Sequence, residues 1–70
     1  MNERTMRITI NQESFELPEG ATLAEAIAAF EAQPPFAVAL NRQFVHRHRY
    51  GQTTLQPGDR IEIVQPVAGG

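Results

Sequence analysis

A single helical pattern lies between segments in which apolar and polar residues alternate, and this order leaves few folds open to a chain of 70 residues. The alternating runs at 6–10 and 14–17 are joined by polar residues and predict a β-hairpin at the start of the chain. A chain this short builds one core and leaves little room for a deep catalytic cleft. The pattern therefore predicts one α+β domain, in which one helix covers one sheet.

The helix is predicted over about 23–32. Thr22 and Glu25 form a capping box, in which the hydroxyl and the carboxylate satisfy backbone amides at the start of the helix. The apolar side chains of the helix fall on one stripe, which comprises Leu23, Ala26, Ile27 and Phe30. The Pro34-Pro35 pair prevents the helix from continuing. This stripe is predicted to belong to the core rather than to a binding site.

Short strands are predicted after the prolines. Apolar residues alternate with alanines over 36–40, which suggests a strand that is covered on both faces or lies near a partner. Asn41-Arg42 is a turn candidate, and a short strand follows at 43–45. The last strand is predicted at 60–64, after Pro57-Gly58, whose order is that of a type II turn.

The polar segment 46–54 is predicted to be mostly loop, with the ring of Tyr50 as a candidate anchor. A hairpin, a helix and then further strands, the last of which delivers the C-terminus, is the order of the β-grasp, or ubiquitin-like, architecture. We therefore expect a mixed sheet of four to five strands, in which the first and last strands are parallel central neighbours. The domain is expected to span 1–64, with 1–5 as a flexible extension and 65–70 as a flexible diglycine tail.

The chain contains no cysteine, which excludes disulfides, thiolate metal sites and cysteine nucleophiles. A protein of this composition that handles sulfur cannot do so on a side-chain thiol. Its net charge is −2, no apolar run approaches the roughly 20 residues that a transmembrane helix needs, and the N-terminus does not resemble a signal peptide. We therefore expect a cytoplasmic protein that does not act at a membrane.

Basic residues gather in one short segment, which holds Arg42, His46, Arg47, His48 and Arg49. The net negative charge and the scarcity of nearby aromatic residues argue against nucleic acid as the partner. Docking onto an acidic protein surface fits the segment better, and a solvated loop with ordinary arginines is the alternative. The two histidines lack a third ligand, so no metal site is expected.

The sequence ends in Gly69-Gly70. Glycine has no Cβ, so this pair can pass through a narrow catalytic channel that any side chain would block. The reactive group would be the carboxylate of Gly70, which is ionised at neutral pH and needs activation by another protein. The six residues at 65–70 can extend on the order of 20 Å beyond the sheet. A frayed terminus is the alternative explanation for two glycines at a chain end.

Four segments of the chain resemble the ThiS family of sulfur carrier proteins, namely FELPEGATL at 15–23, LNRQFVHR at 40–47, LQPGDRIEIV at 55–64 and VAGG at 67–70. The resemblance covers nearly the whole chain. Two positions depart from the family pattern. Asn11-Gln12 stands where the family often has Asn-Gly, which leaves the turn type open. His46 stands where proline commonly precedes the arginine, which leaves the local backbone path open.

The resemblance implies a carrier of sulfur for the thiazole of thiamin, which acts as a co-substrate and is not an enzyme. An adenylyltransferase of the ubiquitin-activating type would use MgATP to convert the carboxylate of Gly70 to an acyl adenylate. Sulfur drawn from cysteine through a desulfurase would then give a thiocarboxylate, which a thiazole synthase consumes. Gly69 would clear the path of the tail, and the carrier itself would bind no cofactor. The candidates for docking these partners are Phe44, Val45, Arg47 and Val67.

Three other functions remain open at this point. The small subunit of molybdopterin synthase shares the fold, the diglycine end and the thiocarboxylate chemistry, although it is usually longer than this chain. A ubiquitin-like modifier would form covalent adducts with lysines of other proteins. A non-covalent ubiquitin-like interaction module would keep its function after removal of Gly70, whereas either carrier would lose its function completely.

Overall fold

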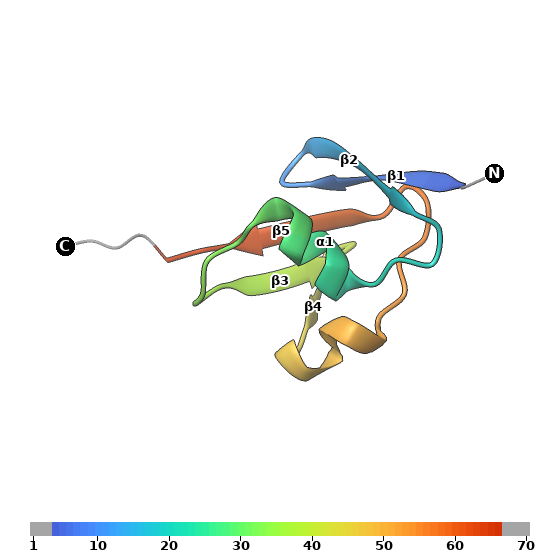
Figure 1. Cartoon of the computed structure of the whole chain (residues 1–70). Helices are drawn as coiled ribbons and strands as arrows, with labels where there is room; N and C mark the ends of the chain where they lie inside the picture. The colour runs from blue at the N-terminus through green and yellow to red at the C-terminus, as the bar shows by residue number, and fades with distance from the viewer. Residues whose placement is uncertain (1–3, 67–70) are drawn as a thin grey trace.

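The computed structural model describes residues 4–66. Within this range the chain forms β1 (Thr5–Ile10), β2 (Glu13–Pro18), α1 (Leu23–Phe30), β3 (Ala37–Leu40), β4 (Gln43–Val45), the 3-10 helix η1 (Arg47–Gln52) and β5 (Arg60–Val64). Figure 1 shows that β5 runs toward the end of the molecule where the β1–β2 turn lies. Most of the predicted extension at 1–5 and of the predicted tail at 65–70 lies outside the described residues.

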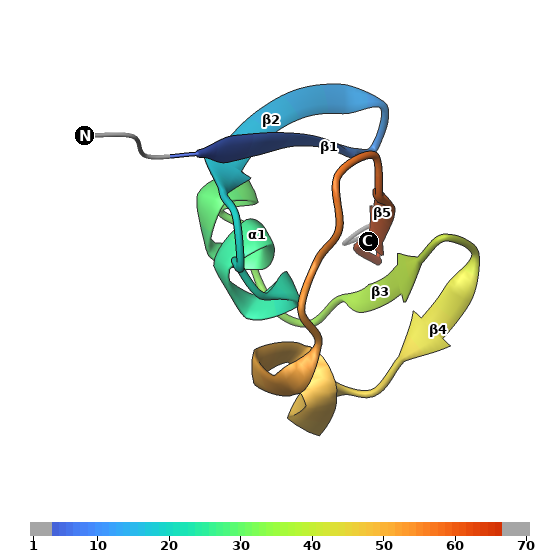
Figure 2. The same ribbon diagram turned by 90° about the vertical axis from the view of Figure 1, so that its right-hand side faces the viewer.

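The strands form one mixed sheet in the order β2-β1-β5-β3-β4. β1 pairs antiparallel with β2 and parallel with β5, and β3 pairs antiparallel with both β5 and β4. β5 is therefore the central strand and β1 is its parallel neighbour, as predicted. Figure 2 shows α1 against one side of the twisted sheet, with η1 beside it. The single helix on a mixed five-stranded sheet confirms the predicted β-grasp architecture.

The core lies between α1 and the side of the sheet that faces it, which we call the inner face. Its buried apolar side chains come from alternate strand positions, from the helical stripe and from two loops, and comprise Met6, Ile8, Ile10, Val38, Ile61, Ile63, Leu23, Ala26, Ile27, Ala21 and Leu55. Full burial of one of the valine, leucine, isoleucine or methionine side chains contributes about 1.5–3 kcal/mol. The intervening strand residues point to the opposite side of the sheet. We call this side the outer face, and its members include Arg7, Glu16, Ala37, Ala39, Phe44, Glu62 and Val64.

The start of α1 is as predicted, but its end is not. The hydroxyl of Thr22 accepts a hydrogen bond from the amide of Glu25 at 3.3 Å, which is one half of the capping box. The helix then stops at Phe30, because Glu31 adopts a left-handed conformation with φ 60°. The amide of Glu31 and the amide that follows it bond back to the last turn, as in a Schellman motif. The predicted continuation to 32 is therefore wrong, since a glutamate in this position carries no sequence signal for a helix end.

The segment 46–54 is more regular than predicted, since residues Arg47–Gln52 form η1. The amide of Arg49 donates to the carbonyl of His46 at 2.8 Å, and the carbonyl of Arg49 accepts from the hydroxyl of Thr53 at 2.8 Å. These bonds link residues three and four apart and need no apolar period, which is why a polar sequence did not reveal them. Tyr50 does anchor the segment, because its ring stacks on Phe36 with centroids 6.2 Å apart.

The two hairpins share one turn geometry. Asn11 and Gln12 have φ 50° and 73°, and Asn41 and Arg42 have φ 51° and 73°. Positive φ at both central residues defines a type I′ turn, whose twist matches that of the flanking strands. Asparagine tolerates this conformation better than most residues. The departure at Asn11-Gln12 thus leaves a regular hairpin turn in place.

The turn before β5 is of the predicted type. Gly58 has φ 86°, and the amide of Asp59 donates to the carbonyl of Gln56 at 3.1 Å, as a type II turn requires. The carboxylate of Asp59 also accepts from the amide of Gln56 at 2.8 Å. Asp59 therefore serves the turn that leads into β5.

Candidate functional site

The residues predicted to carry the chemistry, Gly69 and Gly70, lie outside the described residues, and so does the docking candidate Val67. What the structure describes is the point from which the C-terminal segment leaves the domain. We call residues 63–66 the tail root. β5 ends within it at Val64, beside the β1–β2 turn and the loop between α1 and β3 (Figure 1).

One side of the tail root is held by the side chain of Asn11. Strand β1 pairs with β5 only as far as Ile10 and Ile61. The backbone groups of β5 that follow Ile61 therefore have no partner residue in β1. The side chain of Asn11 takes that place, because its Oδ1 accepts from the amide of Ile63 at 2.8 Å and its Nδ2 donates to the carbonyl of Ile63 at 3.1 Å. Both hydrogen bonds are partly buried.

The other side of the tail root is held by β3 and by the loop that precedes it. Ala37 pairs with Val64 in the antiparallel ladder. One residue further on, Nε2 of Gln65 donates to the carbonyl of Gln33 at 2.9 Å. The described part of the C-terminal segment is thus tied to the domain from two directions.

A second candidate site is the apolar part of the outer face. Phe44 and Val64 are the large apolar side chains exposed among residues 4–66, with 63% and 65% of their surface accessible. Ala39 faces both Phe44 and Glu62 across its neighbouring strands, and its small side chain leaves a shallow surface there. Sequence reasoning missed Val64, although an apolar residue at the outward position of an alternating strand could have revealed it.

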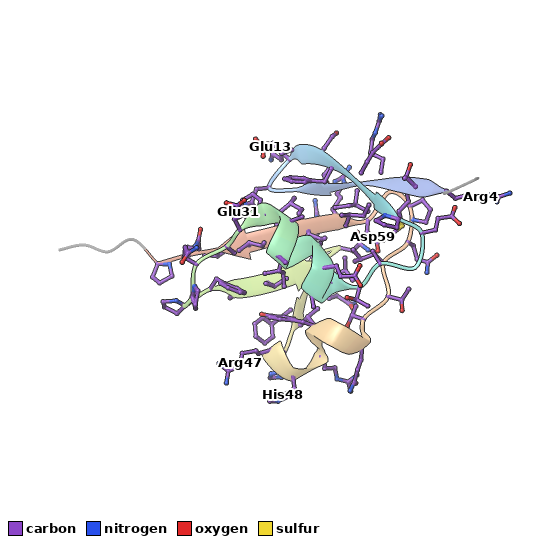
Figure 3. The ribbon with its side chains drawn as sticks, viewed as in Figure 1. Arg4, Glu13, Glu31, Arg47, His48 and Asp59 are labelled. Carbon is purple, nitrogen blue, oxygen red and sulfur yellow. The ribbon has the colours of Figure 1, made fainter. Side chains whose placement is uncertain are left out.

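The structure separates the predicted docking residues. Phe44 and Val45 are adjacent in β4 and therefore point to opposite sides of the sheet. Val45 is half-buried and packs against the core. Arg47 is exposed at the start of η1, and Figure 3 shows it with His48 on the side of the molecule away from Glu13.

An aromatic row connects Phe44 to η1. The ring of His46 meets Phe44 edge-on with centroids 5.1 Å apart, and His48 stacks on His46 at 6.1 Å. Beside this row lies a hollow of about 350 Å³, lined by Leu40, Gln43, Phe44, Val45, His46, Arg49 and Thr53. The basic segment at 42–49 contains no acidic residue. The row therefore presents aromatic rings beside a segment in which the charged side chains are arginines.

The described residues hold no cluster of three or more His, Cys, Asp or Glu side chains that could bind a metal ion. None of the helices found in 4–66 has the length and hydropathy to span a bilayer. Within the same range, every buried side-chain nitrogen or oxygen has a hydrogen-bond partner. The candidate sites that the described residues do form are the tail root and the exposed apolar part of the outer face.

Comparison with known proteins agrees with this arrangement. The ThiS family model matches residues 1–70, including the positions beyond the described structure. The sulfur carrier protein ThiS of Escherichia coli (strain K12) is 33% identical over 66 residues, which cover 93% of this chain and 100% of that protein. A crystal structure of the thiamine biosynthesis protein ThiS from Geobacter metallireducens has a TM-score of 0.76 at 25% identity, and the match covers 93% of this chain and 100% of that one. The chain therefore belongs to the ThiS family.

Proposed function

We propose that this protein carries sulfur for thiamin biosynthesis as a thiocarboxylate on Gly70. The observation that carries the proposal is the family match over residues 1–70, which includes the diglycine end. Membership of the ThiS family makes the chain a small carrier rather than a catalyst. The absence of cysteine is compatible with this chemistry, because the sulfur resides on a backbone carboxyl group and not on a side-chain thiol.

The first step is activation of the Gly70 carboxylate. A carboxylate is a poor electrophile, so an adenylyltransferase of the ubiquitin-activating type uses MgATP to activate it. A carboxylate oxygen bonds to the α-phosphorus, the bond from this phosphorus to the β-phosphate oxygen breaks, and pyrophosphate leaves. The product is an acyl adenylate whose leaving group is AMP.

The second step replaces AMP by sulfur. A sulfur nucleophile, drawn from cysteine through a desulfurase, attacks the acyl carbon, and AMP leaves with the electron pair of the broken carbon–oxygen bond. When the donor is a persulfide, a thiol supplies the two electrons that release the thiocarboxylate. A thiazole synthase then transfers the sulfur to its acceptor. The carbon–sulfur bond of the thiocarboxylate breaks, an oxygen atom from the acceptor or from water bonds to the acyl carbon, and the carboxylate of Gly70 is regenerated.

The apolar part of the outer face, around Phe44 and Val64, is the docking surface in this proposal. Phe44 and Val64 are exposed on the same side of the sheet, and an exposed aromatic side chain is a typical anchor of a protein interface. Arg47 and the neighbouring basic residues would steer the carrier toward an acidic partner surface. Docking would thus hold the domain while the C-terminal segment enters the catalytic channel of each partner in turn.

The test is intact-mass spectrometry of the protein after incubation with MgATP, its adenylyltransferase and a sulfur donor. We expect one oxygen of the C-terminus to be replaced by sulfur in the full chain. A variant that lacks Gly70 should keep its fold and show no such replacement, which serves as the matched control. An unchanged mass of the full chain, with an adenylyltransferase that loads its own carrier, would contradict the proposal.

The thiazole pathway is distinguished from molybdopterin synthesis by the acceptor. The thiocarboxylate form should donate its sulfur to a thiazole synthase reaction and not to the large subunit of molybdopterin synthase. The similarity to thiamin biosynthesis proteins supports this choice. Transfer to the molybdopterin enzyme alone would favour the second pathway while leaving the carrier chemistry intact.

A further inference from the structure

Two asparagines with closely similar φ angles hold the two ends of β5. Asn11 and Asn41 each occupy the first central position of a type I′ turn, with φ 50° and 51°. The amide of Asn11 donates to the carbonyl of Ile61 at 2.9 Å, and the amide of Asn41 donates to the carbonyl of Arg60 at 2.7 Å. The side chain of Asn11 also bonds to Ile63 of β5, and that of Asn41 bonds to Arg60 of β5 and to Asp59 just before it. The central strand β5 is therefore held by the turns that follow its two neighbouring strands, β1 and β3.

The side chains of the two asparagines bind at different positions along β5. Asn41 binds the first residue of the strand, because its Oδ1 accepts from the amide of Arg60 at 2.9 Å, and its Nδ2 donates to Asp59 at 3.0 Å. Asn11 binds Ile63, just before the chain leaves the sheet. In Figure 1 the β1–β2 turn lies at the end of the molecule from which the C-terminal segment departs, and the β3–β4 turn lies toward the other end.

We propose that Asn11 is a positioning residue for sulfur loading, because it fixes the place and the direction in which the C-terminal segment leaves the domain. The inference rests on the function proposed above. Gln65 assists from the opposite side through its bond to the carbonyl of Gln33. Asn41, which makes comparable bonds at the start of β5, serves the fold alone.

The physical reason for this role of Asn11 is the short length of chain between the end of the sheet and Gly70. The residues at 66–70 can span at most about 17 Å when fully extended, so the origin of the segment determines which sites its carboxylate can reach. A fixed origin raises the effective concentration of the carboxylate at the partner's active site. When the side-chain hydrogen bonds of Asn11 are lost, the last residues of β5 separate from the β1–β2 turn. The carboxylate then samples a larger volume with fewer productive orientations.

The experiment compares Asn11→Gly with Asn41→Gly. Glycine adopts positive φ without strain, so each variant keeps its turn and loses only the side-chain hydrogen bonds. Steady-state adenylation is measured by pyrophosphate release with the adenylyltransferase and MgATP, at a temperature where circular dichroism shows each variant to be folded. Asn11→Gly should lower kcat by about tenfold and leave KM within about twofold, because the docking surface is untouched. Asn41→Gly should leave both constants within about twofold of those of the parent protein.

Hydrogen exchange gives a second readout that needs no partner. The amide of Ile63 donates to Asn11, so its exchange should become faster in Asn11→Gly and stay slow in Asn41→Gly. Equal kcat values in the two variants would overturn the inference, and so would unchanged protection of the Ile63 amide in Asn11→Gly. A rise in KM without a fall in kcat would also overturn it, because that result assigns Asn11 to docking.

These experiments distinguish a failure of the positioning role of Asn11 from a failure of the proposed carrier function. If the parent protein is not adenylated at all, the carrier chemistry fails, and the exchange of the Ile63 amide still decides whether Asn11 holds the tail root. If the parent protein is loaded and the two variants behave alike, the carrier chemistry stands and the positioning role of Asn11 is refuted.

Discussion

The inner and outer faces of the sheet take alternate residues of the same strands, yet they use apolar side chains differently. In β5 the inner residues Ile61 and Ile63 are 1% and 5% exposed, whereas Val64 on the outer face is 65% exposed. Phe44 on the outer face of β4 is 63% exposed. An apolar side chain on the inner face stabilises the fold by its burial, but one on the outer face gains little until a partner covers it. The comparison separates residues that maintain the domain from residues that are available for binding.

The largest expected effect comes from truncating the inner face. Ile61→Ala should lower the free energy of unfolding by about 3 kcal/mol, because it removes buried methyl groups and leaves a cavity beneath α1. Val64→Ala, three positions along the same strand, should change it by less than about 0.5 kcal/mol. Urea unfolding followed by circular dichroism measures both. Equal losses of unfolding free energy in the two variants would contradict the distinction between the inner and outer faces.

An intermediate effect is expected from Phe44→Ala, and it should appear in binding rather than in folding. The variant should raise KM for the adenylyltransferase by about tenfold, since an exposed aromatic anchor of an interface contributes on that scale. Its free energy of unfolding should stay within about 0.5 kcal/mol of the parent value. Arg7→Ala, which alters the outer face on β1, is the control and should leave KM unchanged. A KM that does not respond to Phe44→Ala would place docking elsewhere.

The smallest effect concerns the polar half of the outer face. Arg7 and Glu16 lie opposite each other in β1 and β2, and their closest charged atoms are 3.7 Å apart with both side chains largely exposed. Solvent screens such a pair, so a double-mutant cycle with alanine should give a coupling free energy below about 0.5 kcal/mol. A coupling above about 1 kcal/mol would show that the outer face also stabilises the domain.

Much of the fold was predictable because hydrophobic periodicity records burial directly. The alternation around Ile8 and Ile61 identified two strands, and the cap at Thr22 located the start of the helix. The end of α1 was not predictable, because Glu31 adopts a left-handed conformation that its residue type does not favour. The 3-10 helix was missed for a related reason, since its local hydrogen bonds leave no apolar repeat in the sequence.

The candidate site was only partly predictable. The diglycine end could be recognised because its position and its lack of side chains are themselves the signal. The role of Asn11 could not, because its side chain bonds to a residue 52 positions away, and that contact exists only once β1 and β5 lie side by side. The apolar residue type and outward position of Val64 follow from alternation, but its exposure requires that no other residue of 4–66 cover the outer face there, which only the folded structure shows.

The stacking of Tyr50 on Phe36 also supplies the protein with an optical label of its own. Tyr50 is the single tyrosine and the chain has no tryptophan, so its ultraviolet fluorescence comes essentially from one ring. That ring sits where η1 meets the loop before β3, far from the diglycine end in the sequence. Its emission therefore follows the integrity of the packed domain without being altered chemically by events at Gly70. Among variants that fail to be loaded, a single fluorescence measurement can thus separate those that have lost their structure from those that remain folded.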